Sequence, residues 1–143
     1  MTPTGITRVL FVCIGNSCRS QMAEGFARTY GSDCLMAASA GLAPAVRVAA
    51  DTRRAMEEKN IDLSQHYPKS LRSLERETFE IIVNMAGIPL PGKFGEARLL
   101  DWAVPDPISM NYANHRAVRD EIERRVMGLI MELRRFGSAK APR

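Results

Sequence analysis

The sequence predicts an α/β domain with a parallel β-sheet and helices on both of its faces. Short apolar segments suited to strands alternate along the chain with longer segments of helical periodicity. The first apolar segment, residues 9–12, has no polar position, which is typical of a strand buried on both faces of a parallel sheet. The 143 residues contain no repeat and no long linker, so we expect a single domain over 1–143.

The first half of the chain contains two strand–helix pairs. Met22, Phe26 and Tyr30 recur every four residues, which predicts an amphipathic helix after the first strand. The predicted elements of this half are a strand at 9–12, a helix that ends at Gly31, a strand at 34–41, and a helix at 49–59 with Asn60 as its left-handed C-cap.

The second half contains two more strands and the clearest helix. An apolar stripe at helical spacing begins at Val118 and continues to Leu133. The predicted elements of this half are a short helical stretch around 70–79, strands at 80–85 and 97–104, and a final helix that ends at Gly137.

The charge and the cysteine content exclude several classes of function. The net charge of +4 is mild, and the basic residues near the end of the chain indicate a flexible tail over 136–143 rather than a nucleic-acid-binding arm. No apolar run approaches the roughly 18 residues of a membrane span, and no export signal precedes the first strand. An odd number of cysteines, three, then indicates reduced thiols. We therefore predict a cytoplasmic protein that binds neither nucleic acid nor a membrane.

The turn after the first strand, VCIGNSCRS, carries the candidate chemistry. Cys13 and Arg19 bracket five residues, the arrangement C-x5-R. Because the turn leads from a strand into a helix, its backbone N–H groups are free and the positive end of the helix dipole faces it, which makes a cradle for an anion. Gly15 and Asn16 tolerate the positive φ that lets successive amides converge. The predicted oxyanion-binding loop is Ile14, Gly15, Asn16, Ser17, Cys18 and Arg19.

Within this cradle Cys13 is predicted to be a nucleophile. The positive field of the loop favours the thiolate, and a thiolate beneath a bound phosphate is aimed at phosphorus. Arg19 can hold two oxygens of a tetrahedral anion at once. A zinc site would need C-x2-C pairs or matching histidines, and a nucleotide-binding P-loop would need a Gly-Lys-Ser/Thr ending; the sequence contains neither. We therefore expect no metal and no cofactor, because Arg19 and the amides supply the charge stabilisation.

Four segments of the chain match one family pattern: VLFVCIGNSCRS (9–20), SAG (39–41), NIDLSQH (60–66) and VPDP (104–107). Together they resemble the low-molecular-weight protein tyrosine phosphatases and the arsenate reductases built on the same fold. The resemblance implies a four-stranded parallel sheet. It also implies Cys13 as nucleophile, Arg19 as the clamp on the transition state and Asp106 as general acid. A carboxyl held between two prolines suits a proton donor.

The resemblance also implies a supporting network around the loop. Such a network would hold Asn16 in a strained conformation and let the Ser20 hydroxyl stabilise Cys13 as a thiolate. His115 matches no position of the pattern, so we expect it to face solvent. The network residues are Asn16, Ser20, Ser39 and His66.

Two departures from the pattern favour the reductases and one opposes them. Phosphatases of the family usually carry an aromatic residue soon after SAG, where this chain reads LAPAVRV, and often a tyrosine after the Asp-Pro pair, where it has Ile108. Tyr112 is the nearest substitute. Thioredoxin-coupled reductases need two further cysteines just after the third strand, where this chain has Met85 and no cysteine. Cys34 starts the second strand, at the opposite end of the sheet, and is expected to be a small buried hydrophobe.

We therefore predict a phosphotyrosine-type phosphomonoester hydrolase that works through a cysteinyl-phosphate intermediate, on a phosphorylated protein or a small phosphomonoester. The alternative is an arsenate reductase of the same fold that takes arsenate together with an external small thiol or a glutaredoxin-type reductant. Cys18 is the candidate redox partner of Cys13. A non-catalytic oxyanion-binding module is a third hypothesis, which the presence of Cys13, Arg19 and Asp106 together disfavours.

Overall fold

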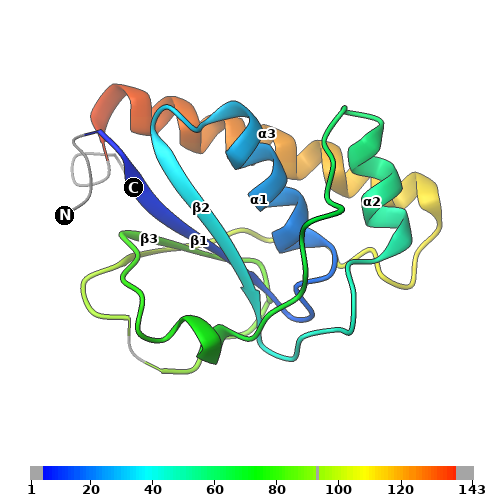
Figure 1. Cartoon of the computed structure of the whole chain (residues 1–143), viewed down its shortest axis with the longest axis horizontal. Helices are drawn as coiled ribbons and strands as arrows, with labels where there is room; N and C mark the ends of the chain where they lie inside the picture. The colour runs from blue at the N-terminus through cyan, green and yellow to red at the C-terminus, as the bar shows by residue number, and fades with distance from the viewer. Residues whose placement is uncertain (1–4, 93, 138–143) are drawn as a thin grey trace.

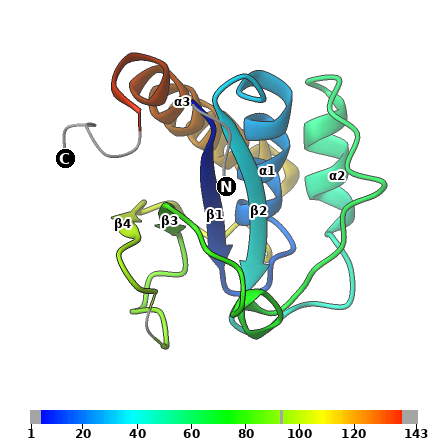
Figure 2. The same cartoon turned by 60° about the vertical axis from the view of Figure 1, so that its left-hand side comes forward.

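The computed structural model describes residues 5–92 and 94–137. Its strands are β1 (Thr7–Cys13), β2 (Leu35–Gly41), β3 (Ile81–Asn84) and β4 (Arg98–Asp101). They form one sheet in the order β2-β1-β3-β4, and every neighbouring pair is parallel. Figure 1 labels the first three of these strands, and Figure 2 labels all four. The predicted four-stranded parallel sheet is confirmed.

The register of the central strand β1 decides where the site lies. Phe11 pairs with Ser39 on one side and with Val83 on the other, and Cys13 pairs with Gly41. Because all strands run in the same direction, the segments that follow them meet at one edge of the sheet. The strand order reverses between β1 and β3, and α/β sheets bind their ligands at such a switch point.

Helices cover the two faces of the sheet unequally. The helices are α1 (Arg19–Tyr30), α2 (Ala50–Glu57), the 3-10 helix η1 (Leu71–Leu74) and α3 (Tyr112–Phe136). The three α-helices share one apolar core with the same face of the sheet (Figures 1 and 2). On the other face, η1 is the only helix among the described residues, and it packs beside the segments that flank β3.

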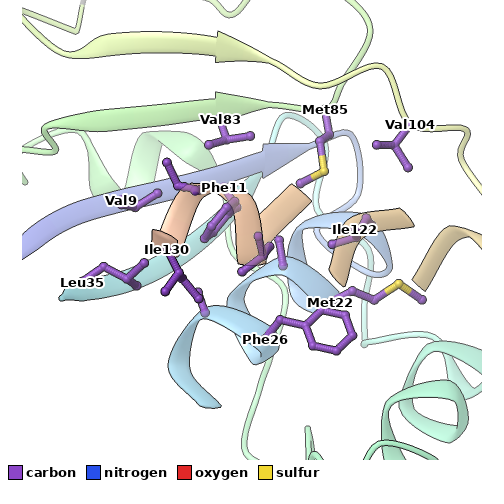
Figure 3. Close-up of a cluster of buried hydrophobic side chains, with 14 of the residues drawn as sticks. Val9, Phe11, Met22, Phe26, Leu35, Val83, Met85, Val104, Ile122 and Ile130 are labelled. Carbon is purple, nitrogen blue, oxygen red and sulfur yellow. The ribbon is translucent and has the colours of Figure 1, made fainter. Parts of the chain in front are cut away.

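The side chains of β1 alternate between two cores. Val9 and Phe11 share the larger core with Phe26 and Ile130, on the side of α1 and α3 (Figure 3). The intervening residues of the strand enter a smaller core on the other face. Burial on both faces explains the uninterrupted apolar run in the sequence. The smaller core consists of Leu10, Val12, Ala40, Phe79 and Ile82.

Two of the helix ends agree with the sequence pattern, while α2 ends at Glu57 with Glu58 as its C-cap, two residues before the predicted Asn60. α1 ends before Gly31, and Asn60 and Gly137 have left-handed φ angles of 61° and 73°. α3 includes Phe136, the first residue of the predicted tail, while residues 138–143 of that tail lie outside the described residues. None of the helices in the described part of the chain has the length and apolar character needed to cross a membrane.

His115 was expected to face solvent, and this expectation is wrong. The residue is only 2% exposed, and its Nδ1 lies 3.3 Å from the carbonyl oxygen of Asn111, the N-cap residue of α3. It precedes Val118 by three residues and therefore lies on the same buried face of the helix. The apolar stripe of this helix begins one turn earlier than the sequence reading assumed.

Candidate active site

The loop between β1 and α1 lies at the carboxyl edge of the sheet. Cys13 is the last residue of β1 and Arg19 is the first residue of α1. No side chain caps the start of α1, and its first turn contains no acidic residue. The positive end of the helix dipole therefore faces the loop without a carboxylate of that turn to neutralise it.

The outer side of the loop is hydrogen-bonded to the segment that follows β2. The N–H of Ala43 donates to the carbonyl of Ile14 at 2.8 Å, and the N–H of Ala45 donates to that of Gly15 at 2.9 Å. The N–H groups of residues 14–18, by contrast, have no partner within the part of the chain that the structure describes. With these carbonyls bonded on the outside, the amides remain available to an anion.

Asn16 is the left-handed residue of this loop. Its φ is 49° and its side chain is fully buried, in agreement with the predicted tolerance for positive φ. Gly15 was expected to use the same freedom, but its φ is not positive. A Cβ added at Gly15 would lie 3.8 Å from its nearest neighbour, the Cβ of Ser17, which is an ordinary van der Waals contact. The expectation of a positive φ at Gly15 was therefore wrong.

Gly41 is the glycine that the loop requires. A Cβ at this position would lie 2.8 Å from the carbonyl oxygen of Ile14 and 2.9 Å from the backbone nitrogen of Asn16. Both are backbone atoms of the loop, so neither can move aside without changing its shape. The close approach of β2 to the loop explains why the SAG segment ends in glycine.

Gly41→Ala is expected to distort the loop, with a loss of about 1–3 kcal/mol of folding stability and weaker binding of phosphate. Urea unfolding and calorimetric titration with phosphate measure the two effects. Gly128→Ala is the matched control, because a Cβ there meets no atom within 4 Å and alanine favours the helix. If Gly41→Ala keeps both the stability and the phosphate affinity of the unmodified protein, the close approach has no functional weight.

Three of the predicted network residues lie together beneath the loop. The Sγ of Cys13, which is 2% exposed, lies 2.9 Å from the Oγ of Ser20. Asn16 donates through Nδ2 to the Oγ of Ser20 at 2.7 Å and to the Oγ of Ser39 at 2.9 Å. The structure thus brings these residues into contact, while the roles assigned to them stay predictions.

His66, the fourth predicted member, reaches the loop through an intermediary. Its Nδ1 lies 2.9 Å from the Oε1 of Gln21, whose Nε2 donates to the carbonyl of Asn16 at 3.1 Å. Burial lowers the pKa of His66, although the nearby carboxylate of Glu24 acts in the opposite direction. The ring is therefore neutral near pH 7, and its Nδ1–H donates to the amide oxygen, which can only accept.

Sequence reasoning missed three polar residues of this network: Gln21, Glu24 and Lys69. Gln21 is fully buried and Glu24 is 4% exposed, although both lie on an amphipathic helix whose polar positions normally face solvent. One signal was available, because Glu24 follows Ser20 by four residues and so shares its face of α1. Lys69 gave no such signal.

The guanidinium of Arg19 is anchored at the carboxyl edge of the sheet. Its Nη1 donates to the carbonyl of Val104 at 3.1 Å and to that of Met85. The side chain is 6% exposed, and its Nε is buried without a hydrogen-bond partner among the described residues. A buried N–H without a hydrogen-bond partner costs folding free energy, and a bound anion would supply the missing acceptor. This nitrogen is therefore available to an anion in the loop.

Asp106 lies beside Arg19, as the shared edge of a parallel sheet predicts. Its Oδ2 is 3.5 Å from the Nη2 of Arg19, and its Oδ1 accepts a hydrogen bond from the N–H of Ile108 at 3.1 Å. The carboxylate side chain remains 44% exposed. It is thus held in place from one side and open to a substrate oxygen on the other.

The other two cysteines differ in position and surroundings. Cys18 is 4% exposed, and burial raises the pKa of its thiol more than the hydroxyls of Thr52 and Ser17 lower it. Cys34 is equally buried, with its Sγ 3.9 Å from the carbonyl oxygen of Ile130 at the other end of the sheet. Cys18 is therefore the cysteine that shares the loop with Cys13, and Cys34 lies apart, as expected.

Tyr112 does not substitute for the missing aromatic wall. Its hydroxyl donates to the Oε2 of Glu58 at 2.7 Å, and its ring lies under the guanidinium of Arg54 at 3.9 Å, so it packs against α2. Tyr67 is an aromatic residue near the network that was not anticipated: it is 64% exposed, and its carbonyl accepts from the Nε2 of Gln21 at 3.2 Å.

The fold and the loop define the class: an α/β domain that carries a cysteine-containing anion loop after its central strand. A model of the family described as low molecular weight phosphotyrosine protein phosphatase matches residues 8–89. The chain belongs to this family of enzymes. Both the fold and the family are those that the resemblance in the sequence indicated.

Similar proteins over nearly the whole chain are named arsenate reductases. The glutaredoxin arsenate reductase of Synechocystis sp. is 33% identical over 129 residues, which cover 88% of this chain and 98% of that protein. A putative arsenate reductase of Halobacterium salinarum is 31% identical over 137 residues, covering 92% and 96%. A solved arsenate reductase in its phosphate-binding state superposes with a TM-score of 0.82 at 33% identity, covering 89% of this chain and 98% of that one. These names favour the alternative activity over a phosphotyrosine-type hydrolase.

Proposed function

We propose that this protein is an arsenate reductase that uses an external thiol. The observation that carries the proposal is the near full-length similarity to proteins named arsenate reductases, at 33% and 31% identity. The loop residues supply the chemical rationale. Arsenate is a tetrahedral oxyanion like phosphate, so the free amides of residues 14–18 and the unpaired Nε of Arg19 suit it.

The first step is attack of the Cys13 thiolate on arsenic(V). A sulfur–arsenic bond forms and an arsenic–oxygen bond breaks, and Asp106 protonates the departing oxygen so that it leaves as water. Arg19 and the loop amides hold the negative charge of the remaining oxygens. This assignment keeps Cys13, Arg19 and Asp106 in the roles that the sequence predicts.

The second step is the redox step. A thiolate attacks the Sγ of Cys13, a disulfide forms, and the sulfur–arsenic bond breaks with both electrons passing to arsenic, which leaves as arsenite. A second thiol then reduces the disulfide and regenerates Cys13. In total one arsenate and two thiols give one arsenite, one disulfide and one water.

The thiols for this step have to come largely from outside the chain. The segment between β3 and β4 contains no cysteine, and the residue after β3 is Met85, which is 1% exposed and whose thioether cannot exchange disulfides. Cys34 lies at the opposite end of the sheet. Cys18 remains for a disulfide with Cys13, but that disulfide would be buried at the floor of the loop.

We therefore expect a small thiol with a glutaredoxin to support arsenate turnover, and thioredoxin with its reductase to support little or none. Reduced-cofactor consumption in the two coupled systems measures this, with arsenite formation followed directly. The Synechocystis relative carries glutaredoxin in its name, which makes that reductant the first to test. Steady turnover driven by thioredoxin alone contradicts the external-thiol mechanism, and no turnover with either system contradicts the reductase.

Phosphomonoester hydrolysis is the second candidate, because one observation favours it. Asp106 lies 3.5 Å from Arg19, where a carboxyl can protonate a leaving phenolate and then activate water. The same loop would hold the phosphate while Cys13 forms the cysteinyl-phosphate intermediate. Hydrolysis of para-nitrophenyl phosphate, measured beside arsenate reduction in one preparation, ranks the two activities.

A further inference from the structure

The hydrogen bonds behind the loop run outward from the amide Nδ2 of Asn16, through Ser39 to a buried carboxylate and through Ser20 toward Cys13. Glu24 can only accept, so the hydroxyl of Ser39 donates to its Oε1 at 2.5 Å. The Oγ of Ser39 then accepts from the Nδ2 of Asn16 at 2.9 Å. Glu24 is 4% exposed, so water does not compete for this contact in any large measure.

The amide of Asn16 is oriented from its other side as well. The backbone N–H of Lys69 donates to its Oδ1 at 3.0 Å, which leaves Nδ2 facing the two serines. The second hydrogen of Nδ2 goes to the Oγ of Ser20 at 2.7 Å. Since Ser20 receives this bond, its own hydrogen is left for the Sγ of Cys13 at 2.9 Å. A donor aimed at sulfur favours the thiolate over the thiol.

The side chain of Lys69 brings a positive charge to the same place. Its Nζ donates to the carbonyl of Ser39 at 3.1 Å and to that of Tyr67 at 3.3 Å. The ammonium thereby joins the end of β2 to the segment that contains His66, and it holds the backbone N–H of Lys69 against Asn16. Burial lowers the pKa of Lys69, and the charge of Glu24 opposes this shift.

The other titratable groups near Glu24 contribute less. Arg28 lies 2.8 Å from its Oε2, but the arginine side chain is 59% exposed, where an ion pair is worth little. The Nδ1 of His66 is 4.0 Å from the same oxygen, and burial keeps that ring neutral near pH 7. Asp62 accepts hydrogen bonds from Ser64 and acts on His66 by charge, away from Ser20 and Ser39.

We propose that Lys69 and Glu24 are positioning residues for the Cys13 thiolate. The carboxylate of Glu24 takes the hydrogen of Ser39, and the backbone N–H of Lys69, held in place by the lysine ammonium, orients the amide of Asn16. Together they leave the hydrogen of Ser20 for the sulfur. The proposal rests on Cys13 being the nucleophile of the proposed function, but it concerns the sulfur before any substrate arrives.

Alkylation of Cys13 by iodoacetamide tests this without arsenate, phosphate or a reductant. The rate is followed on the Cys13 peptide by mass spectrometry at pH 6 and pH 9. For Lys69→Met and Glu24→Gln we expect a rate about tenfold lower at pH 6, the size of one lost hydrogen bond to a charged group. At pH 9, above the pKa of an ordinary cysteine thiol, the rates should approach that of the unmodified protein. Lys69→Arg should restore part of the rate at pH 6.

Lys59→Met is the matched control, because the Nζ of Lys59 pairs with Glu123 at 3.0 Å between α2 and α3. It should leave both rates unchanged. Equal rates at pH 6 for the unmodified protein and the folded Lys69→Met or Glu24→Gln variant overturn the proposal, as does an equal loss for Lys59→Met. If Lys69→Met does not fold, as its melting curve reveals, the isosteric Glu24→Gln decides alone. Failure of arsenate turnover in the unmodified protein would count against the proposed function and leave this result intact.

Discussion

Cys13→Ser is expected to abolish turnover of arsenate and of aryl phosphates while the protein still binds phosphate. The serine hydroxyl keeps a polar contact with Ser20 but does not ionise near neutral pH, so no nucleophile is present. Binding should persist because we expect the anion contacts to come mainly from the backbone amides of residues 14–18 and from Arg19, whose Nε has no partner among the described residues. Turnover is measured with both substrates, and binding by calorimetric titration with phosphate.

Cys34→Ala is the matched control for this experiment. Cys34 is also buried, but it lies at the opposite end of the sheet, so its loss should leave turnover nearly unchanged. More than a few per cent of the original activity in Cys13→Ser would contradict the assignment of Cys13 as nucleophile. Loss of phosphate binding in the same variant would instead indicate that the sulfur shapes the loop.

Asp106→Asn is expected to slow turnover roughly 10²–10⁴-fold where the leaving oxygen needs a proton, the usual range for a general acid. Arsenate, which loses water, and phenyl phosphate belong to this class. The loss should be much smaller with 2,4-dinitrophenyl phosphate, whose phenolate departs without a proton. Asparagine keeps an acceptor for the N–H of Ile108, so the turn itself should survive.

Asp101→Asn serves as the control for the lost charge, because Asp101 is an exposed carboxylate at the end of β4, five residues before Asp106. It should leave all three rates unchanged. If Asp106→Asn lowers the rate on phenyl phosphate and on 2,4-dinitrophenyl phosphate equally, Asp106 acts through the loop structure and not as a proton donor.

The sequence was most informative where function depends on neighbours along the chain. Cys13 and Arg19 are joined by a turn whose length fixes their relation, so the C-x5-R spacing carried most of the loop geometry. The meeting of Asp106 with Arg19 was also predictable, since parallel strands bring the segments after β1 and β4 to one edge. Both inferences depend on the chain direction and not on packing detail.

Residues whose partners lie far along the chain were harder to place. Gln21 and Glu24 are ordinary polar residues of an amphipathic helix until the segment containing His66 covers them. Lys69 enters the network through its own backbone as much as through its side chain, which no residue pattern reveals. Tyr112 was the nearest substitute in the sequence for the missing tyrosine, yet its partners are Arg54 on α2 and Glu58 just after that helix.

The hydrogen bonds from Ala43 and Ala45 mean that the loop is already built before any anion arrives. Binding of an anion to such a loop does not carry the entropy cost of ordering the loop backbone. The loop also recognises only the tetrahedral shape and the charge of an anion, because its amide N–H groups and guanidinium contact the oxygens and not the central atom. Phosphate is then a competitor for the same place, and discrimination between the two anions falls to the sulfur. Only arsenic(V) accepts two electrons from thiols, so selectivity of the proposed reductase resides in the reaction and not in the fit.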